Sequence, residues 1–314
     1  MSTPHPTPDR PLRIGTRGSP LALAQAHETR ARLMAAHGLP EAAFAIAVIK
    51  VTGDQILDRP LKDIGGKGLF TREIEEALLA GEIDIAVHSS KDMPTAQPEG
   101  LVLDVFLPRE DVRDAFVSLA GGPAGLADLA AGAVVGTSSL RRRAQLLARR
   151  PDLRVVEFRG NVQTRLRKLE EGLAEATFLA MAGLNRLGLA HLARSGVDPD
   201  EMLPAVAQGA IGIERRVGDA ATAALLAPIA CAETGARLAC ERAFLARLDG
   251  SCQTPIAGLA RIAGGVLWLK GEVLRPDGSE VVAAEGRAPV EQAAALGDTV
   301  GRDILGRLPA GFFA

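Results

Sequence analysis

The residues best suited to chemistry come soon after four short apolar runs that read as β-strands. Arg17 follows the first run, Asp92 the second, Arg141 the third and Arg159 the fourth. Ligands bind beyond the carboxyl ends of the strands in an open α/β sheet, so these side chains are expected to line a binding site. Arginine offers a planar fork of N–H donors that matches carboxylate and phosphate groups. The pattern therefore predicts a site for an anion.

The arginines after the third run conflict with local helix physics. Arg141–Arg143 fall in the first turn of a helix predicted over 140–149, where the helix dipole is positive. A cation there costs about 0.3–1 kcal/mol, and a bound anion would remove that cost. The alternative interpretation, a solvated basic face with i,i+4 pairs, suits Arg149 and Lys168 better. We therefore expect the arginines beside the strand ends to bind an anion.

Asp92 follows a predicted buried strand over 83–87 and precedes Pro94. Its carboxyl group could act as a general acid or base, as the counter-ion of a cation, or as a turn former. The spacing alone favours the turn. Beside arginines, the carboxylate would stay ionised and could stabilise a cation.

Cys252 lies in a loop of small residues, 249–255, after a helix predicted over 233–248. Small neighbours leave its thiol accessible, and both a covalent role and an inert loop cysteine remain open. Cys231 and Cys240 are expected in the apolar core. Three cysteines at no metal-ligand spacing predict neither a disulfide framework nor a metal site, and they fit a reducing compartment.

Short β-branched runs alternate with longer amphipathic segments, which predicts an α/β fold with largely parallel sheets. The expected strands are 12–15, 45–51, 83–87, 133–136, 154–158, 176–181, 256–262 and 266–274. The expected helices are 21–37, 71–80, 140–149, 162–171, 233–248 and 290–307. Ile14-Gly15-Thr16 and Val135-Gly136-Thr137 both stand at a strand-to-helix turn. This repeat suggests two lobes of similar design.

The composition limits the function. The chain has 314 residues, a net charge of −2, 3% aromatic residues and no tyrosine. Scarce aromatic residues argue against base stacking, and the near-neutral charge argues against a globally basic, nucleic-acid-binding protein. Residues 1–10 are polar and proline-rich, without the apolar core of a signal peptide, and are expected to form a disordered tail. No apolar run is long enough to span a membrane, so the expected location is the cytoplasm.

Eight segments, in order, resemble the porphobilinogen deaminase family. They are RIGTRGSPLALAQA (13–26), VTGDQILDRPLKDIGGKGLFTREIE (51–75), DIAVHSSKDMPT (84–95), VGTSSLRRRAQL (135–146), FRGNVQTRL (158–166), AMAGLNRLGL (180–189), LPAVAQGAIGIE (203–214) and ERAFLARLDGSCQTPIAG (241–258). One such segment would be weak, but eight in series make chance similarity implausible. The resemblance runs from about residue 12 to the C-terminus.

The resemblance implies a monomer of three domains. Two lobes would share the doubly wound α/β topology of periplasmic binding proteins, and a small α/β C-terminal domain would carry the cofactor. Lobe 1 would comprise 11–107 with 208–228, lobe 2 would comprise 108–207, and the cofactor domain 229–314.

The resemblance also implies a transferase of tetrapyrrole biosynthesis. Cys252 would hold a dipyrromethane cofactor through a thioether, and four porphobilinogens would be joined head to tail with loss of ammonia. Hydrolysis would then release the linear tetrapyrrole hydroxymethylbilane. Asp92 matches the catalytic carboxylate, which contacts pyrrole N–H groups and stabilises the developing cation.

Cations are expected because every pyrrole ring carries a pair of carboxylates. The residues that match cofactor-binding positions are Ser89, Lys91, Thr137, Ser138, Ser139, Arg141, Arg142 and Gln208. Those that match substrate-binding positions are Arg17, Ser19, Lys67, Arg159, Arg165 and Arg186. Asp63 and Ser251 depart from the residues of some family members, and neither removes a chemical group on which the assignment depends.

Three rivals are weighed against this interpretation. A non-catalytic two-lobed binding protein for an anion would share the fold but would have no need of Cys252. A nucleic-acid-binding module built on Arg141–Arg143 conflicts with the charge and with the scattering of cations over separate strand ends. A phosphate-binding NTPase fails because Gly65-Gly-Lys-Gly68 is not a P-loop.

Overall fold

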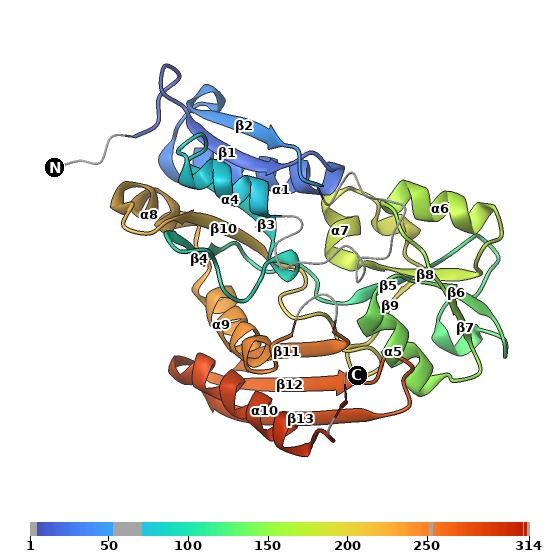
Figure 1. Cartoon of the computed structure of the whole chain (residues 1–314). Coiled ribbons are helices and arrows are strands. Elements are labelled where there is room, and N and C mark those ends of the chain that lie inside the picture. The colour runs from blue at the N-terminus through green and yellow to red at the C-terminus, as the bar shows by residue number, and fades with distance from the viewer. Residues whose placement is uncertain (1–4, 53–70, 251–253, 310, 313–314) are drawn as a thin grey trace. The chain divides into compact units, whose positions relative to one another are not determined.

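The computed structural model describes residues 5–52, 71–250, 254–309 and 311–312 (Figure 1). Two predicted site residues, Lys67 and Cys252, lie outside the described residues. The chain divides into two compact units. Unit 1 contains the described parts of 1–56 and 65–110 together with 210–235. Unit 2 contains 111–209 with the described parts of 236–314.

A five-stranded sheet forms the centre of unit 1, in the order β2-β1-β3-β10-β4. Its strands are β1 (Leu12–Arg17), β2 (Phe44–Ile49), β3 (Ile85–Ser89), β4 (Leu101–Phe106) and β10 (Ile211–Arg216). The first three run parallel, and β10 lies antiparallel between β3 and β4. The same unit holds the helices α1 (Pro20–His37), α4 (Arg72–Leu79) and α8 (Ala220–Leu226). Fully buried Ile14, Leu33 and Ile213 belong to its core.

The second five-stranded sheet, in unit 2, has the order β7-β6-β8-β5-β9. Its strands are β5 (Asp114–Ser118), β6 (Val134–Gly136), β7 (Arg154–Val156), β8 (Ala176–Ala180) and β9 (Ser195–Gly196). Strands β6, β7 and β8 are parallel, and β5 lies antiparallel between β8 and β9. Its helices are α5 (Leu140–Arg149), α6 (Val162–Glu170) and α7 (Met181–Arg186). Phe116 and Phe178 meet edge to face in its core, with ring centroids 5.8 Å apart.

The two sheets share one strand plan, as the repeated glycine turn predicts. In each sheet the first parallel strand lies between the second and the third, and an antiparallel strand follows. Gly15 in β1 and Gly136 in β6 occupy equivalent places. A Cβ at Gly15 would lie 2.2 Å from Ile83 Cδ1, and one at Gly136 would lie 2.3 Å from Phe158 Cγ. Both positions need glycine because a side chain packs directly against the backbone.

The C-terminal part of unit 2 is a three-stranded antiparallel sheet with two helices. Its strands are β11 (Ile256–Ala263), β12 (Val266–Leu274) and β13 (Val281–Pro289). Its helices are α10 (Ala293–Arg307) and α9 (Ala232–Arg247), of which α9 belongs to this unit from residue 236 onward. Helix α10 lies along β12 and β13 (Figure 1). The turn after β12 packs on α5, because Gly278 adopts a φ of +76° and approaches the backbone of Ala148 too closely for any side chain.

These elements confirm the predicted fold class of two doubly wound α/β lobes with a small α/β C-terminal domain. The three-domain boundaries stay a prediction. Short 3₁₀ turns complete the described chain: η1 (Glu41–Ala43), η2 (Ser90–Asp92), η3 (Leu126–Asp128), η4 (Ala190–Leu192), η5 (Ala227–Ile229) and η6 (Val290–Gln292). Within the expected tail, Thr7 and Arg10 close a turn through paired backbone hydrogen bonds. Among the described helices, no single one is long and apolar enough to cross a membrane. The bent pair Ala220–Ile229 and Ala232–Arg247 reaches the necessary length and apolar composition only when the two segments are taken together.

Candidate anion-binding site

A fully buried carboxylate, Asp114, brings three of the predicted site residues together. Arg141 Nη2 donates to Asp114 Oδ2 at 2.7 Å, and Arg142 Nη2 donates to Oδ1 at 2.8 Å. Gln208 Nε2 donates to the same Oδ1 at 2.9 Å. Burial raises the pKa of Asp114, but the charges of Arg141 and Arg142 outweigh burial and hold this pKa well below its usual value. Asp114 is therefore a permanent anion at the centre of the cluster.

Local structure fixes both arginines in one orientation. They lie in the first turn of α5, where the Ser139 hydroxyl caps the helix by accepting the N–H of Arg142. Arg141 Nη1 donates to the carbonyl oxygen of Leu203 at 2.7 Å, and Arg142 Nη1 donates to that of Phe178 at 2.9 Å. The predicted conflict with the helix dipole is thus relieved, within unit 2, by a carboxylate of the protein itself.

A third cation, Arg165 of α6, shares a carbonyl group with this cluster. Its Nη1 donates to the Phe178 carbonyl oxygen at 3.2 Å, and its Nε donates to that of Gly160 at 3.0 Å. Burial, with the charge of Arg142, lowers the pKa of Arg165 to about 10. Arg165 stays charged at neutral pH, so three guanidinium groups lie near Asp114. The charge of Glu272 also acts on Arg141, although burial raises the pKa of Glu272 and so disfavours its ionised form. Guanidinium groups therefore still outnumber the carboxylates that act on them.

Donor atoms without a partner in the described part of the chain remain in the cluster and on Arg159, which lies between β7 and α6. The Nε atoms of Arg141 and Arg142 and the Nη1 atom of Arg159 are buried and have no hydrogen-bond partner among the described residues. A buried donor left without a partner costs about 1–3 kcal/mol, and more when it is charged. Excess positive charge and unsatisfied N–H groups together fit a ligand that carries carboxylates.

The other predicted residues of unit 2 serve the turns around these arginines. Thr137 accepts the N–H of Ser139, and Ser138 accepts the N–H of Phe158 at 3.0 Å. Arg186, the last residue of α7, donates to the carbonyl oxygen of Gly209 at 3.0 Å. These contacts shape the loop that follows β6 and position the segment that contains Gln208.

The remaining predicted residues with described positions belong to unit 1. Ser19 caps α1 and accepts the N–H of Ala22, while the Ser89 hydroxyl pairs with the side chain of Gln25. Arg17 is the last residue of β1, and Lys91 lies in η2. Asp92 ends η2 directly after β3, and its side chain is exposed. The carboxylate is therefore presented at the carboxyl end of a parallel strand, as predicted.

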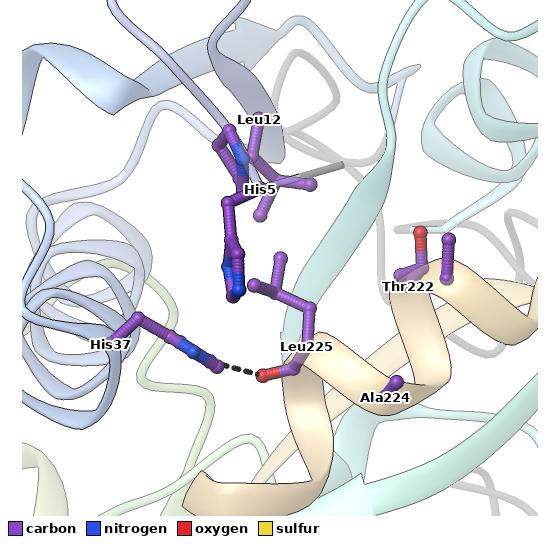
Figure 2. Close-up of a pocket in the computed structure, with 8 residues that line it drawn as sticks. His5, Leu12, His37, Thr222, Ala224 and Leu225 are labelled. Carbon is purple, nitrogen blue, oxygen red and sulfur yellow. Dashed lines mark hydrogen bonds between the residues drawn. The ribbon is translucent and has the colours of Figure 1, made fainter. Parts of the chain in front are cut away.

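Two further features of unit 1 stand apart from these residues. A pocket of about 110 Å³ lies between the N-terminal segment, α1 and α8, where His37 Nε2 and the Leu225 carbonyl oxygen are 2.8 Å apart (Figure 2). No predicted site residue lines it. His88 and Glu214 form a buried pair, with 3.3 Å between Nε2 and Oε2. Neither feature was predicted.

The two described cysteines differ in their surroundings. Cys240 is buried as predicted, and burial raises its pKa to about 12. The prediction that Cys231 is a core residue is wrong, because it is only half-buried just before α9. Burial raises the pKa of Cys231, but hydrogen bonds from Thr234 outweigh that effect and lower it overall. Among the described residues, no group of three or more His, Cys, Asp or Glu could hold a metal ion.

Asp114 is the site residue that the sequence did not identify. It begins the apolar strand β5, three residues after Asp111, and either acid could have been chosen from the sequence. Asp111 instead pairs with Arg113 near the surface. An acid that opens a fully buried strand is a signal, because a buried carboxylate needs a partner.

Replacing Asp114 with asparagine is expected to destabilise the protein strongly. The change keeps the size of the side chain and leaves Arg141 and Arg142 buried without their counter-ion, which costs about 3–5 kcal/mol. Urea unfolding of Asp114→Asn would measure this loss. Asp152→Asn is the matched control, because Asp152 pairs with Arg150 near the surface; there we expect less than about 1 kcal/mol. Equal losses in the two variants would contradict the account.

The stability difference between the wild type and Asp114→Asn is expected to depend on pH. The folded-state pKa of Asp114 is depressed from the ordinary value of 3.8, so its contribution to stability is present above that value. The contribution is lost as the pH falls below 3.8. The difference in unfolding free energy between the wild type and Asp114→Asn should therefore shrink in acid. A difference that grows as the pH falls would show that Asp114 is not held as an anion.

The fold and the cluster together define an α/β protein with two doubly wound sheets and a buried cluster of arginines whose chemistry suits carboxylate groups. Two family models match the chain. "Porphobilinogen deaminase, dipyromethane cofactor binding domain" matches residues 12–224, and "Porphobilinogen deaminase, C-terminal domain" matches residues 236–306.

Two known proteins with sequences similar to this chain are also porphobilinogen deaminases. The porphobilinogen deaminase of Paracoccus denitrificans is 70% identical over 311 residues, covering 99% of both chains. The chloroplastic porphobilinogen deaminase of Pisum sativum is 56% identical over 308 residues, covering 96% of this chain and 83% of its own. Among solved structures, the periplasmic VFT2 domain of Bordetella pertussis BvgS matches 72% of this chain and 87% of its own, with 16% identity and a TM-score of 0.39.

The chain therefore belongs to the porphobilinogen deaminase family. Members of this family are hydroxymethylbilane synthases, transferases of tetrapyrrole biosynthesis that act on porphobilinogen with a dipyrromethane cofactor. The predicted family, reaction and cofactor are confirmed. The roles of individual residues stay predictions.

Proposed function

We propose that the arginine cluster around Asp114 binds the carboxylates of the dipyrromethane cofactor. The observation that carries this proposal is the excess of guanidinium groups over carboxylates, together with buried Nε atoms that lack a partner among the described residues. The cofactor supplies the free pyrrole α-carbon to which substrate units are added. Arg141 and Arg142 would hold it, and Thr137, Ser138 and Ser139 would shape the loop beside it.

The cofactor would be tethered by Cys252. Support for this role comes from the family match and from the sequence, in which Cys252 follows α9 among small residues. Cys240 is a poor alternative because burial raises its pKa to about 12, which disfavours the nucleophilic thiolate.

Asp92 would stabilise the cation that develops on the substrate when ammonia leaves. Support for this role comes from the exposed position of the carboxylate at the end of η2, where it would be open to a substrate, could accept a pyrrole N–H and could offset the positive charge. Ser89 and Lys91, on the same segment, would assist in holding the cofactor. Porphobilinogen and the growing chain would be bound by Arg17, Ser19, Lys67, Arg159, Arg165 and Arg186.

We further propose the domain boundaries, the oligomeric state and the cellular location of the enzyme. Lobe 1 would be 11–107 with 208–228, lobe 2 would be 108–207, and the cofactor domain would be 229–314. The enzyme would act as a monomer in the cytoplasm, without nucleic acid or membrane. Light scattering of the purified protein would test the monomer, and cell fractionation would test the location.

Substitution of Arg165 tests the substrate-binding role. Arg165→Gln removes a charged donor, and hydrogen bonds to charged groups contribute about 1.5–3 kcal/mol, so we expect KM for porphobilinogen to rise about ten- to a hundredfold. Release of ammonia and formation of the tetrapyrrole would be followed together. Arg167→Gln, on the exposed face of the same helix, is the control and should leave KM within about twofold.

The same assay separates the enzyme from the rival binding protein. Release of ammonia with formation of the tetrapyrrole is the reaction of the family, whereas a binding protein would take up porphobilinogen without releasing ammonia. Equal KM values for Arg165→Gln and Arg167→Gln would contradict the proposed role of Arg165.

A further inference from the structure

The segment that contains Gln208 has an unusual backbone conformation. Ala207, one residue earlier, has a φ of +61°, and it is one of two non-glycine residues with positive φ in the described chain. This left-handed region is unfavourable for a residue with a Cβ atom, so surrounding contacts must hold it. Ala207 is also almost completely buried, at 1% exposure. The conformation directs the chain at the point where the Gln208 side chain reaches Asp114.

One carboxylate holds this conformation from the C-terminal part of unit 2. Glu241 of α9 is fully buried, and its Oε2 accepts the N–H of Ala207 at 2.7 Å. Its Oε1 accepts the N–H of Ala260, in β11, at 2.8 Å. The two oxygens of one side chain therefore tie the segment before β10 to the three-stranded sheet.

Other hydrogen bonds also attach the 203–209 segment to neighbouring elements of unit 2. Gly258 N donates to the carbonyl oxygen of Pro204 at 3.1 Å, and Leu203 N donates to Gln145 Oε1 at 2.7 Å. The 203–209 segment is thus fixed at its start by α5 and β11 and near its end by Glu241. Gln208 also donates to the Val112 carbonyl oxygen at 2.8 Å, which aligns its amide with Asp114.

We propose that Glu241 is a positioning residue for the arginine cluster. By accepting the N–H of Ala207, it keeps Gln208 in place to donate to Asp114, and Asp114 in turn orients Arg141 and Arg142. This inference rests on the proposed anion-binding function of the cluster. Since α9 ends at Arg247, shortly before Cys252 in the sequence, one helix both leads into the cofactor-bearing segment and fixes the residues that would bind the cofactor's carboxylates.

We call the hydrogen bond from the Ala207 N–H to the Glu241 carboxylate the clamp. The test combines a variant that weakens the clamp with a second substitution that is expected to restore the conformation at residue 207. Glu241→Gln nearly preserves shape, but its amide nitrogen cannot accept a second backbone N–H. We expect faster deuterium uptake in the peptide that covers 203–209, a lower fraction of protein carrying the cofactor by intact mass, and a KM raised about tenfold with kcat within about threefold. Ala207→Gly adopts the positive φ without a Cβ clash and should leave these values near the wild type.

The rescue distinguishes positioning from general stability. Adding Ala207→Gly to Glu241→Gln should restore at least half of the lost protection from deuterium exchange at 203–209. It should also reverse at least half of the change in log KM. Glu280→Gln, which removes a charge from an exposed ion pair with Arg275, is the control and should change none of these values. If Glu241→Gln is not recovered as folded protein, Glu241→Asp, which keeps the charge and shortens the side chain, takes its place in the same series.

Two results would overturn the inference. Unchanged uptake at 203–209 in the Glu241 variant would show that no clamp operates, and faster uptake without a change in KM or cofactor occupancy would show that the clamp does not position the site. Failure of the proposed function would appear separately, as an unchanged KM in Arg165→Gln while the uptake at 203–209 still responds to Glu241.

Discussion

Cys252→Ser is expected to purify without cofactor and without activity. A serine hydroxyl is a far weaker nucleophile than a thiolate, so the thioether to the dipyrromethane would not form. The rest of the chain is unchanged, and the variant should fold. Its denatured mass should equal that of the bare polypeptide, and porphobilinogen should not be consumed.

Cys231→Ser is the matched control for this experiment. Cys231 is half-buried and its pKa is lowered, so it is the more reactive of the two described thiols, yet no role is assigned to it. This control should retain the cofactor and normal turnover. Full cofactor mass in Cys252→Ser would show that Cys252 is not the attachment residue. Loss of the cofactor in Cys231→Ser alone would show the same.

Asp92→Asn is expected to fold normally and to lose most of its turnover. The side chain is exposed, so the free energy of unfolding should change by less than about 0.5 kcal/mol. Loss of a charge that stabilises a developing cation should lower kcat about a hundredfold or more, as for other preorganised electrostatic groups. Steady-state assays and urea unfolding would be measured on the same preparation.

Asp104→Asn provides the control for the charge change. Asp104 is on β4 and pairs with Arg215 at the surface of unit 1. Its replacement should leave kcat within about twofold. Near-normal turnover in Asp92→Asn would show that the catalytic carboxylate lies elsewhere.

The parallel parts of both sheets could be predicted from the sequence, and the antiparallel strands could not. Helix α5 begins and ends at the predicted residues, because its N-terminal serine cap and amphipathic pattern are local signals. Strands β5 and β10 were not predicted. Each pairs antiparallel with residues distant in the chain, such as Ile213 with Val87, and local pattern does not specify such pairing.

Side chains of the site were predicted better than their partners. Arg141, Arg142 and Gln208 were identified through the family resemblance, and the structure brings them together on Asp114. Asp114 itself was missed because strand β5 was not predicted, and without that strand nothing sets Asp114 apart from Asp111. Glu241 lies within a quoted family segment, but its contact with Ala207 depends on two chain segments folding against each other.

The tether at Cys252 would be tested by the intact mass of the purified wild-type protein under denaturing conditions, followed by peptide mapping. We expect a mass excess of two linked pyrrole units, localised to the peptide that contains Cys252. A preparation at the bare polypeptide mass would be incubated with porphobilinogen or the preformed tetrapyrrole and weighed again. Continued failure to gain mass, or a mass excess on another peptide, would show that Cys252 does not carry the cofactor.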